Sequence, residues 1–345
     1  MTVRGVQPPS GSRPTLETVA ARAGVSRATA SRVLRGSSKV SGSARDAVLL
    51  AADEMAYTVN RAARALVTRR SDSIAFLVAE NEDRMFRDPY FVGVLRGAQT
   101  EAAAAGMQLV FVIASTEAEV EHFTHFVGGG HVDGVLLVSM HGDDQLARRL
   151  EALGVPTVLN GRPLTPEAGL FSVDSDNVEG ACRATELLLE RGARSVATIT
   201  GPLDMSAGQD RLTGYRHALA AAGLPFRRGA AVEGDFTVDG GGTAMSRLLE
   251  TEPHIDGVFV ASDLMALGAI RTLAEQDRRV PDDVAVVGFD DVREAQLTAP
   301  PLSTVRQPLD ELGRTMTRVL LGRIGGVDVP QRTVLPTELI RRQTA

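Results

Sequence analysis

The stretch TLETVAARAGVSRATASRVLRG, residues 15–36, constrains the fold more than any other part of this chain. An apolar-spaced segment from Leu16 to Ala23 is interrupted at Gly24 and resumes after Ser26, whose hydroxyl is suited to cap a new helix. The inward positions hold small or β-branched residues, so two helices can approach closely. The pattern therefore predicts a helix, a tight turn and a second helix.

This arrangement leaves polar and basic side chains along one outward edge of the second helix. Such an edge suits the major groove of double-stranded DNA, which a recognition helix reads with residues near its N-terminus. The alternative is an ordinary pair of packed helices whose arginines are only solvated. The residues that we expect to contact DNA are Ser26, Arg27, Ala28, Thr29, Ser31 and Arg32, with Thr15 before the first helix and Lys39 beyond the second.

Sequence beyond the turn extends this small helical module. Ser41 and Ser43 are alternative N-caps for a third helix over residues 44–55, and Tyr57 is placed to cover the core that the helices share. Residues 60–67, Asn-Arg-Ala-Ala-Arg-Ala-Leu-Val, form a helix-prone run that is too short to be stable alone in water. We expect this run to become helical only when it is docked.

The distribution of charge divides the chain at the same place. Residues 1–71 contain 12 Lys and Arg against 4 Asp and Glu, a net charge of +8, whereas the whole chain contains 37 against 43. The remaining residues are therefore strongly acidic. A concentrated basic module suits the phosphate backbone of a nucleic acid, to which a large acidic body does not bind unaided.

Length and composition limit the rest of the chain. Its 345 residues can form the small module plus one or two α/β domains. No apolar run approaches about 18 residues and no apolar targeting segment follows Met1, so we expect a soluble, cytoplasmic protein without membrane contact. Residues 1–13, rich in Pro, Gly and Ser, predict a disordered tail, and the single Cys182 is expected to be a small core residue rather than a reactive thiol.

From Ser73 onward, apolar strand-like runs alternate with amphipathic segments of helix length. Strands that are apolar throughout and separated by helices indicate parallel sheets covered on both faces. Two such sheets accommodate this many strands, with a ligand site in the crevice between them. The predicted strands are 74–79, 107–113, 132–138, 156–159, 195–200, 255–261 and 284–289. The predicted helices are near 91–105, 117–128, 143–153, 177–191, 208–222, 240–251, 263–277 and 309–322.

The N-terminal pattern T-x-x-x-V-A-x-x-A-G-V-S-x-x-T-x-S-R-V-L, followed by N-R-x-A-x-x-L, resembles the LacI family of bacterial transcription regulators. Short motifs carry the resemblance to the C-terminus, and their joint spacing is specific although each string alone is weak. They are Asp88-Pro89-Tyr90-Phe91, Gly201-Pro202 through Arg211 with Gly214-Tyr215, Ser262-Asp263-Leu264-Met265-Ala266-Leu267-Gly268, Gly288-Phe289-Asp290-Asp291, Ser303 to Pro308 and Leu335-Pro336-Thr337-Glu338-Leu339.

The resemblance implies an architecture and a function. It implies a small all-α helix-turn-helix DNA-binding domain over residues 14–59, a hinge helix over 60–70, and an α/β core over 71–345. That core has two doubly wound parallel-sheet lobes of the periplasmic-binding-protein-like type I. The implied function is that of a homodimeric repressor of carbohydrate-utilisation genes, bound to a near-palindromic DNA operator and controlled by a small-molecule effector, a sugar or sugar derivative.

The resemblance also assigns roles to particular residues. In the hinge, DNA contacts fall on Asn60, Arg61, Ala63 and Leu66, and Leu66 is expected to wedge between base pairs in the minor groove. The effector-binding residues that it implies are Tyr90, Phe91, Arg162, Arg211, Phe236, Ser262 and Asp290.

Residue chemistry fits a sugar at those positions. Arg211 offers a planar fork of donors and Asp290 a bidentate acceptor, which together satisfy vicinal hydroxyls, and Phe236 or Phe91 offers a flat apolar platform. Two alternatives stay open: Arg211 and Asp290 form a structural salt bridge, or the aromatic pair at 90–91 only packs the start of a helix. Both remain compatible with the same sequence.

Two positions depart from the family pattern. Gly161 precedes Arg162 where many members carry an acid, so one expected hydroxyl acceptor is missing. Met205 stands where the purine-responsive branch has an arginine, which argues against a purine effector. The identity of the effector therefore stays open.

Other classes of function find less support. The sequence has no Walker A loop, G-x-S-x-G elbow, H-E-x-x-H or C-x-x-C, so we expect no catalytic residues, no cofactor and no metal. His122 and His125, with His131 and His141, lack carboxylates or cysteines at metal-ligand spacing. The adjacent acids at 282–283 and 290–291 are expected to be solvated rather than to bind a cation.

Two competing hypotheses come from different classes of protein. A sugar-binding transport receptor with the same core needs a signal peptide in place of the DNA-binding module. A nucleic-acid-binding enzyme needs a metal or nucleophile constellation. Neither feature is found in the sequence.

Overall fold

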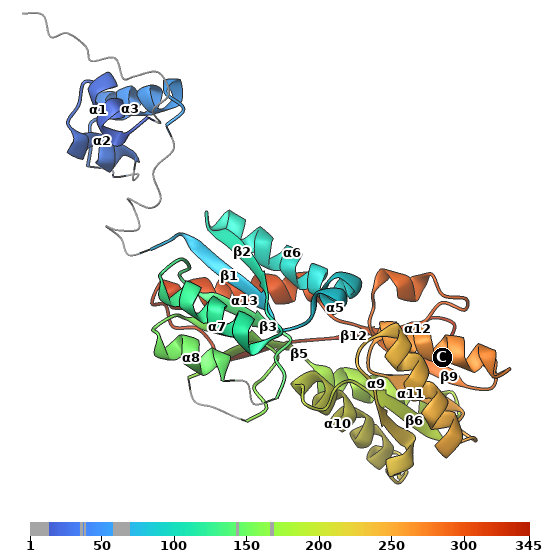
Figure 1. The fold of residues 1–345 in the computed structure, drawn as a ribbon. Helices are drawn as coiled ribbons and strands as arrows, with labels where there is room; N and C mark the ends of the chain where they lie inside the picture. The colour runs from blue at the N-terminus through green and yellow to red at the C-terminus, as the bar shows by residue number, and fades with distance from the viewer. Residues whose placement is uncertain (1–13, 35–36, 38, 58–69, 143–144, 166–168) are drawn as a thin grey trace, which may run out of the picture. The chain divides into compact units, whose positions relative to one another are not determined.

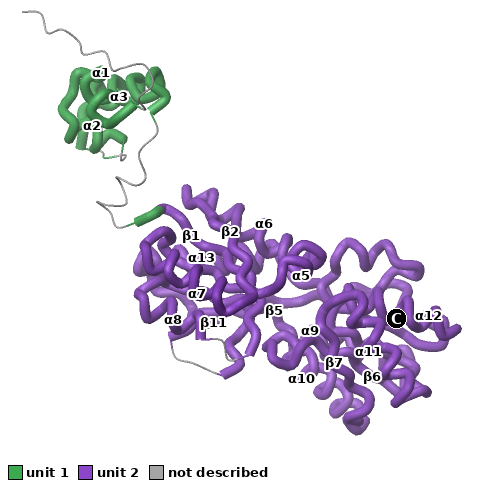
Figure 2. Tube along the Cα trace, viewed as in Figure 1, with its two compact units in different colours: residues 1–71 green, residues 72–345 purple. Residues whose placement is uncertain are grey.

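The computed structural model describes residues 14–34, 37, 39–57, 70–142, 145–165 and 169–345. It divides the chain into two compact units, residues 1–71 and 72–345, called unit 1 and unit 2 below (Figure 2). The predicted tail, residues 1–13, and the hinge residues Asn60, Arg61, Ala63 and Leu66 lie outside the described residues. Each unit has its own apolar core.

Unit 1 contains three described helices (Figure 1). They are α1 (Leu16–Arg22), α2 (Arg27–Leu34) and α3 (Gly42–Glu54). The turn between α1 and α2 contains Gly24 with a φ of +69°, a conformation that glycine adopts without strain. Ser41 caps α3 by accepting a hydrogen bond from the Ala44 backbone, so it, rather than Ser43, is the N-cap.

The core of unit 1 is built almost entirely from small side chains. Because alanine and valine occupy little volume, three short helices can pack closely around a small centre. Tyr57 packs against this core and is partly buried, as the sequence predicts. The buried core residues are Val19, Ala20, Ala30, Val33, Val48, Ala51 and Ala52.

Unit 2 contains two six-stranded sheets. Each sheet, together with the helices that cover it, is called a lobe, and the two are lobe 1 and lobe 2. The lobe 1 sheet has the order β11-β5-β4-β3-β1-β2 and is parallel throughout. The lobe 2 sheet has the order β12-β10-β9-β8-β6-β7 and is parallel except for the pair β10 and β12. The strands of lobe 1 are β1 (Ser73–Val78), β2 (Gln108–Ile113), β3 (Val135–Val138), β4 (Thr157–Asn160), β5 (Phe171–Ser175) and β11 (Arg332–Leu335). Those of lobe 2 are β6 (Val196–Thr200), β7 (Ala231–Glu233), β8 (Gly257–Val260), β9 (Ala285–Asp290), β10 (Ser303–Arg306) and β12 (Glu338–Ile340).

Helices cover both sheets (Figure 1). Two connections between strands also contain short 3₁₀ turns. Lobe 1 has α5 (Glu82–Arg87), α6 (Pro89–Ala104), α7 (Glu117–Gly128), α8 (Leu146–Ala152) and α13 (Leu309–Ile324). Lobe 2 has α9 (Asn177–Glu190), α10 (Ser206–Ala221), α11 (Val238–Thr251) and α12 (Asp263–Glu275), with 3₁₀ turns at Arg228–Ala230 and Arg293–Gln296.

The central strands show why each sheet needs helices on both faces. In β1 the side chains of Phe76 and Val78 join one apolar cluster with α6 and α13, whereas Leu77 joins another with α7 and α8. In β8, Val258 and Phe259 likewise face different clusters. Successive residues of a strand point to opposite faces, so a continuously apolar strand is buried only between two layers. The prediction of two doubly wound parallel-sheet lobes is confirmed.

The chain passes between the lobes after β5, after β10 and after β11. Asn177 begins α9 directly after the first of these crossings, and Gln307 follows β10 at the second. Both residues are buried. The crossings therefore place polar side chains at the junction of the lobes.

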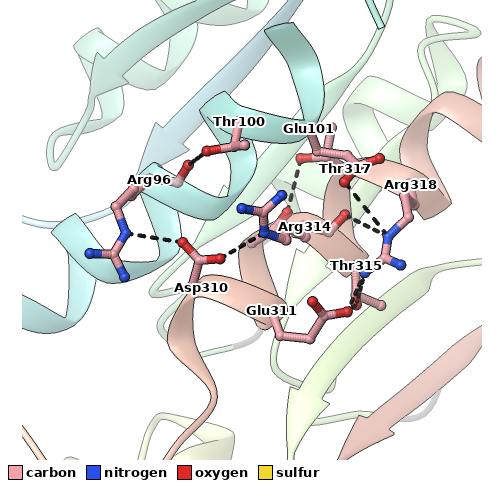
Figure 3. A network of polar contacts seen from close by, with 10 residues as sticks. Arg96, Thr100, Glu101, Asp310, Glu311, Arg314, Thr315, Thr317 and Arg318 are labelled. Carbon is pink, nitrogen blue, oxygen red and sulfur yellow. Dashed lines mark hydrogen bonds and ion pairs between the residues drawn. The ribbon is translucent and has the colours of Figure 1, made fainter. Parts of the chain in front are cut away.

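Helices α6 and α13 pack closely in lobe 1 (Figure 3). A Cβ atom added to Gly97 would lie 1.9 Å from the backbone oxygen of Asp310, so glycine is required for this approach. Along the exposed side, Asp310 accepts hydrogen bonds from Arg96 at 3.0 Å and Arg314 at 2.7 Å. Exposed ion pairs of this kind contribute little individually, so the close packing holds α6, which begins beside the crevice, in place.

Some expectations from the sequence need correction. The sequence did not predict helix α5 or strands β5, β7, β10, β11 and β12. These elements are short, and most carry polar residues that interrupt an apolar run. Cys182 is half-buried on α9 rather than in the core, and its Sγ lies 3.6 Å from the Glu186 carboxylate. Burial, reinforced by that carboxylate, raises the pKa of the thiol to about 11.

Candidate functional site

The start of α2 carries the side chains that the sequence predicts to read DNA. Arg27 and Arg32 are exposed, and so are Ser26 and Ala28, whereas Thr29 and Ser31 are half-buried. The Ser26 hydroxyl accepts a hydrogen bond from the Thr29 backbone at 3.1 Å, so it also caps the helix. Thr15 caps α1, and Lys39 is exposed beyond α2.

Arg27 occupies the first position of α2. Its Nε lies 2.7 Å from a carboxylate oxygen of Glu17, and the two side chains are 71% and 60% exposed. Ion pairs that are so open to water contribute at most about 1 kcal/mol to stability. The guanidinium can therefore leave Glu17 for a stronger acceptor at little cost.

A cavity lies in unit 2 between the lobes. Of the seven residues that the sequence predicts to bind an effector, five line this cavity. Lobe 1 contributes the aromatic pair at the start of α6, and lobe 2 contributes the others. The five are Tyr90, Phe91, Arg211, Phe236 and Asp290.

Arg211 lines this cavity and is 4% exposed. Its Nε donates to Asn177 Oδ1 at 2.9 Å, and its Nη1 donates to the Ala261 carbonyl. The guanidinium carbon lies 3.8 Å from the centre of the Phe289 ring. This set of contacts fixes the orientation of the fork before any ligand enters.

Asp290 ends β9 and faces Arg211, whose Nη1 lies 3.5 Å from Asp290 Oδ1. Gln307 donates a hydrogen bond of 2.7 Å to the same oxygen. Burial raises the pKa of Asp290, although the charge of Arg211 opposes this rise. The salt bridge thus exists, and both of its members also line the cavity, so the geometry is compatible with either role proposed from the sequence.

Several polar lining residues were not assigned as site residues from the sequence. Tyr90 donates a hydrogen bond of 2.6 Å to Asn160, and Asn177 donates one of 2.9 Å to Asp174. Burial, with the nearby charge of Asp210, raises the pKa of Asp174 to about 6. The unassigned polar residues that line the cavity are Asp88, Asn160, Asp174, Asn177 and Gln307. Asn160 and Asp174 end or nearly end parallel strands, and a polar residue at the carboxyl end of an apolar strand is the signal that indicates them.

Two predicted effector residues do not line this cavity. Arg162 is paired with Asp210 through hydrogen bonds of 2.6 Å and 3.0 Å and lines an adjoining cavity. The Ser262 hydroxyl accepts a hydrogen bond of 3.2 Å from the Met265 backbone and so caps α12. The hydroxyl of Ser262 therefore caps a helix, and the residue does not line the cavity.

The aromatic residues combine packing with cavity lining. Phe91 is 1% exposed and belongs to the lobe 1 core, so the packing alternative and the lining role hold together. Phe236 has a φ of +63°, and a Cβ atom on Gly201 would lie 2.1 Å from its ring. Only glycine at position 201 leaves room for this ring.

Four of the seven described residues other than glycine with left-handed backbone lie in or next to the lining of the crevice. Ser139, Phe236, Asp290 and Asp291 have φ values of +63°, +63°, +112° and +55°. Such conformations cost energy and concentrate at ligand sites. The side chain of Asp291 is 3% exposed and is paired with Arg306 and Arg342. The expectation that the acids at 290–291 are solvated is therefore wrong, because the end of β9 lies inside the lobe and arginines neutralise its second acid.

The described residues also bear on metal binding and membrane insertion. Across those ranges, no group of three or more His, Cys, Asp or Glu side chains is arranged to hold a metal ion. In the same part of the chain, no helix has both the length and the apolar character needed to span a membrane.

Family models match both units. Residues 15–60 match the model described as bacterial regulatory proteins, lacI family, and residues 185–345 match the periplasmic binding protein-like domain. The HTH-type transcriptional regulator CelR of Thermobifida fusca is 48% identical over 334 residues, which cover 96% of this chain and 98% of that protein. The ribose operon repressor of Halalkalibacterium halodurans is 33% identical over 332 residues, 96% of each chain.

Solved structures show the same likeness. A complex of the transcriptional regulator CelR with cellobiose has a TM-score of 0.78 and 46% identity, and the match covers 96% of this chain and 100% of that one. A lac repressor dimer bound to operator and the anti-inducer ONPF has a TM-score of 0.84 and 28% identity, with 96% and 99% covered. These matches span both units rather than one of them.

Proposed function

Because this chain belongs to the lacI family of bacterial regulatory proteins, we propose that it represses carbohydrate-utilisation genes and that its effector is a neutral disaccharide of the cellobiose type. It is a sequence-specific DNA-binding transcriptional regulator that responds to a sugar. The observation that carries the choice of ligand is the chemistry of the cavity between the lobes. We propose that this cavity binds a ligand and does not catalyse a reaction.

The charged groups of the cavity favour a neutral, polyhydroxylated ligand. Three carboxylates, Asp88, Asp174 and Asp290, and two guanidiniums, Arg84 and Arg211, line it. Carboxylates accept hydrogen bonds from hydroxyls, and guanidiniums donate to hydroxyl and ring oxygens. A phosphate needs a surplus of positive charge, which these groups do not provide. Sugar phosphates are therefore disfavoured.

The shape of the crevice favours two sugar rings. The cavity adjoins the one lined by Arg162, and the two share Met140, Asn160, Gly161 and Ser206. A ligand in the first cavity can therefore extend into the second. This arrangement, with the bound cellobiose of the relative, supports a disaccharide.

We infer the following organisation for the whole chain. Residues 14–59 form the helix-turn-helix domain, residues 60–70 the hinge helix and residues 71–345 the effector-binding core, and two chains form a dimer on a near-palindromic operator. Base and phosphate contacts fall on the α2 edge and on the hinge. As a regulator of chromosomal genes the protein works in the cytoplasm. A transport receptor with the same core is not favoured, because residues 15–60 match a DNA-binding family.

Calorimetry of the full chain tests the ligand. Cellobiose, maltose, glucose and glucose 6-phosphate are each titrated into the protein under the same conditions. Cellobiose is expected to bind at least about tenfold more tightly than glucose 6-phosphate. Preference for the phosphate, or binding of none of the four sugars, would overturn the choice of ligand and leave the family unaffected.

A further inference from the structure

Helix α5 brings an arginine to the crevice from a segment that the sequence reasoning did not assign to the site. Arg84 lines the cavity, and its side chain is 11% exposed. Its neighbours on the same helix differ, because Arg87 is 79% exposed and paired only loosely with Asp83 at 3.8 Å. Of these two arginines, only Arg84 lines the cavity that contains Arg211 and Asp290.

The guanidinium of Arg84 is almost buried and yet mostly unused. Within the described ranges, its side chain donates one hydrogen bond, to Glu80, although a guanidinium has five N–H donors. Its Nε is enclosed and has no hydrogen-bond partner in that part of the chain. A buried donor without an acceptor is costly, so this side chain has something to gain from an oxygen-bearing ligand.

Its position also spans the two lobes. The guanidinium carbon lies 5.7 Å from the centre of the Phe91 ring in lobe 1 and 5.0 Å from that of Phe236 in lobe 2. Contacts of a cation with two aromatic faces are favourable. The guanidinium therefore lies near aromatic rings of both lobes at the lining of the cavity.

Glu80 holds Arg84 in this place and is itself held from several directions. It accepts a hydrogen bond of 2.6 Å from Ser139, and His141 Nε2 lies 3.0 Å away. The other ring nitrogen of His141 lies 2.9 Å from Asp204 in lobe 2. Burial alone would raise the pKa of Glu80, but the hydrogen bond with His141 and the charge of Arg84 outweigh it and lower the pKa. Glu80 thus stays a carboxylate that anchors the arginine.

We propose that Arg84 is an effector-binding residue whose unused donors bind oxygen atoms of the sugar. The inference rests on the proposed function, because it names a further contact of the same sugar site. Arg84 lines the cavity, so a ligand held there lies beside the donors that Glu80 leaves unused.

The test compares two arginines on one short helix. Calorimetry with cellobiose is performed on the full chain and on Arg84→Met and Arg87→Met. Methionine keeps an unbranched apolar stem but removes every donor. The Arg84 variant is expected to bind cellobiose at least about tenfold more weakly, and the Arg87 variant within about twofold of the parent.

A second substitution keeps the test decisive if Arg84→Met does not fold. Arg84→Lys keeps the positive charge for Glu80 but removes Nε and the planar fork. It is also expected to lose about tenfold in cellobiose affinity. Affinity of either folded variant within about twofold of the parent overturns the proposal. Absence of binding to the parent protein overturns the proposed ligand and this inference with it.

Analogues of cellobiose that each lack one hydroxyl distinguish direct contact from a structural effect. In the parent protein, one analogue should bind more weakly because the oxygen that Arg84 contacts is missing. In Arg84→Met that same analogue should bind as tightly as cellobiose. If every analogue loses the same affinity in both proteins, Arg84 does not contact the sugar and the proposal fails.

Discussion

The two units hold their candidate functional residues in opposite surroundings. On α2 of unit 1, Arg27 and Arg32 are exposed, and the one ion pair described for Arg27 is open to water. In unit 2, Arg211 and Asp290 are 4% and 7% exposed, and both are held by further hydrogen bonds. The same residue types are thus left movable in one unit and fixed in the other.

This difference follows from the partners that each unit binds. DNA brings its own regular array of charge, so long solvated side chains adapt to it and gain affinity from phosphate neutralisation. A small sugar has few groups, so its affinity depends on partners already in position. Substitutions should therefore act mainly on operator affinity in unit 1 and on sugar affinity in unit 2.

The largest effect is expected from Asp290→Ala in the fixed site. The change removes an acceptor and leaves Arg211 and the ligand hydroxyls poorly paired, which costs about 1–3 kcal/mol or more. Sugar affinity measured by calorimetry should fall by at least about tenfold. Operator affinity without sugar should stay the same, because the substitution lies in the other unit.

Thermal unfolding of the same variant decides between the two roles of the salt bridge. If Asp290→Ala lowers the melting temperature sharply while sugar affinity is retained, the pair with Arg211 is structural and the ligand role is wrong. A modest change in melting temperature with lost sugar affinity supports the ligand role.

A smaller effect is expected from Arg27→Ala in the exposed site. Loss of one base contact costs about 1–3 kcal/mol on the preferred operator and relaxes the preference at one base pair. Operator affinity is measured by fluorescence anisotropy on duplexes that differ at single positions. Equal weakening on every duplex would make Arg27 a phosphate contact instead.

Arg22→Ala is the matched control for Arg27. Arg22 ends α1, is 62% exposed and is paired with Glu54 at 2.7 Å, so its removal changes the charge of unit 1 equally. It should weaken binding to all duplexes by a similar, small factor. If Arg22→Ala reproduces the loss of base preference, the effect of Arg27 is one of charge only.

The smallest effect is expected from pH. Burial, with the charge of Asp210, raises the pKa of Asp174 to about 6, and burial also raises the pKa of Asp88. A sugar hydroxyl that donates to a carboxylate favours its ionised form, so binding weakens as pH falls through the pKa of the free protein. Between about pH 7.5 and 5.5, cellobiose affinity should fall roughly three- to tenfold. Asp174→Asn should reduce this dependence without abolishing it, because burial also raises the pKa of Asp290, which lines the same cavity. Tighter binding at the lower pH would contradict the assignment.

Helices and strands that are long and periodic can be predicted from the sequence. The helix-turn-helix and the apolar strands β1, β6 and β9 are apparent from spacing alone. Strand β5 has the polar sequence FSVDS, which does not predict a buried strand, and its Asp174 meets the donor Asn177 only in the folded chain. Helix α5 spans six residues, too few for a periodic signal.

The site shows the same limit more sharply. Arg211 and Asp290 lie in recognisable motifs, whereas Arg84 and Gln307 have no motif and reach the cavity because a short helix and a crossing between lobes bring them there. Ser262 matched a motif, yet its hydroxyl caps a helix in the structure. Motifs identify chain segments, and only the packed lobes determine which side chains meet.

The central claim is that a sugar bound in unit 2 changes the affinity of unit 1 for DNA. It is tested by measuring the operator dissociation constant of the full chain by fluorescence anisotropy, without and with saturating cellobiose, on a duplex selected by the protein from a random pool. The account predicts a change of at least about tenfold, a coupling of about 1.4 kcal/mol. An identical dissociation constant, with calorimetry showing that cellobiose is bound, would contradict it.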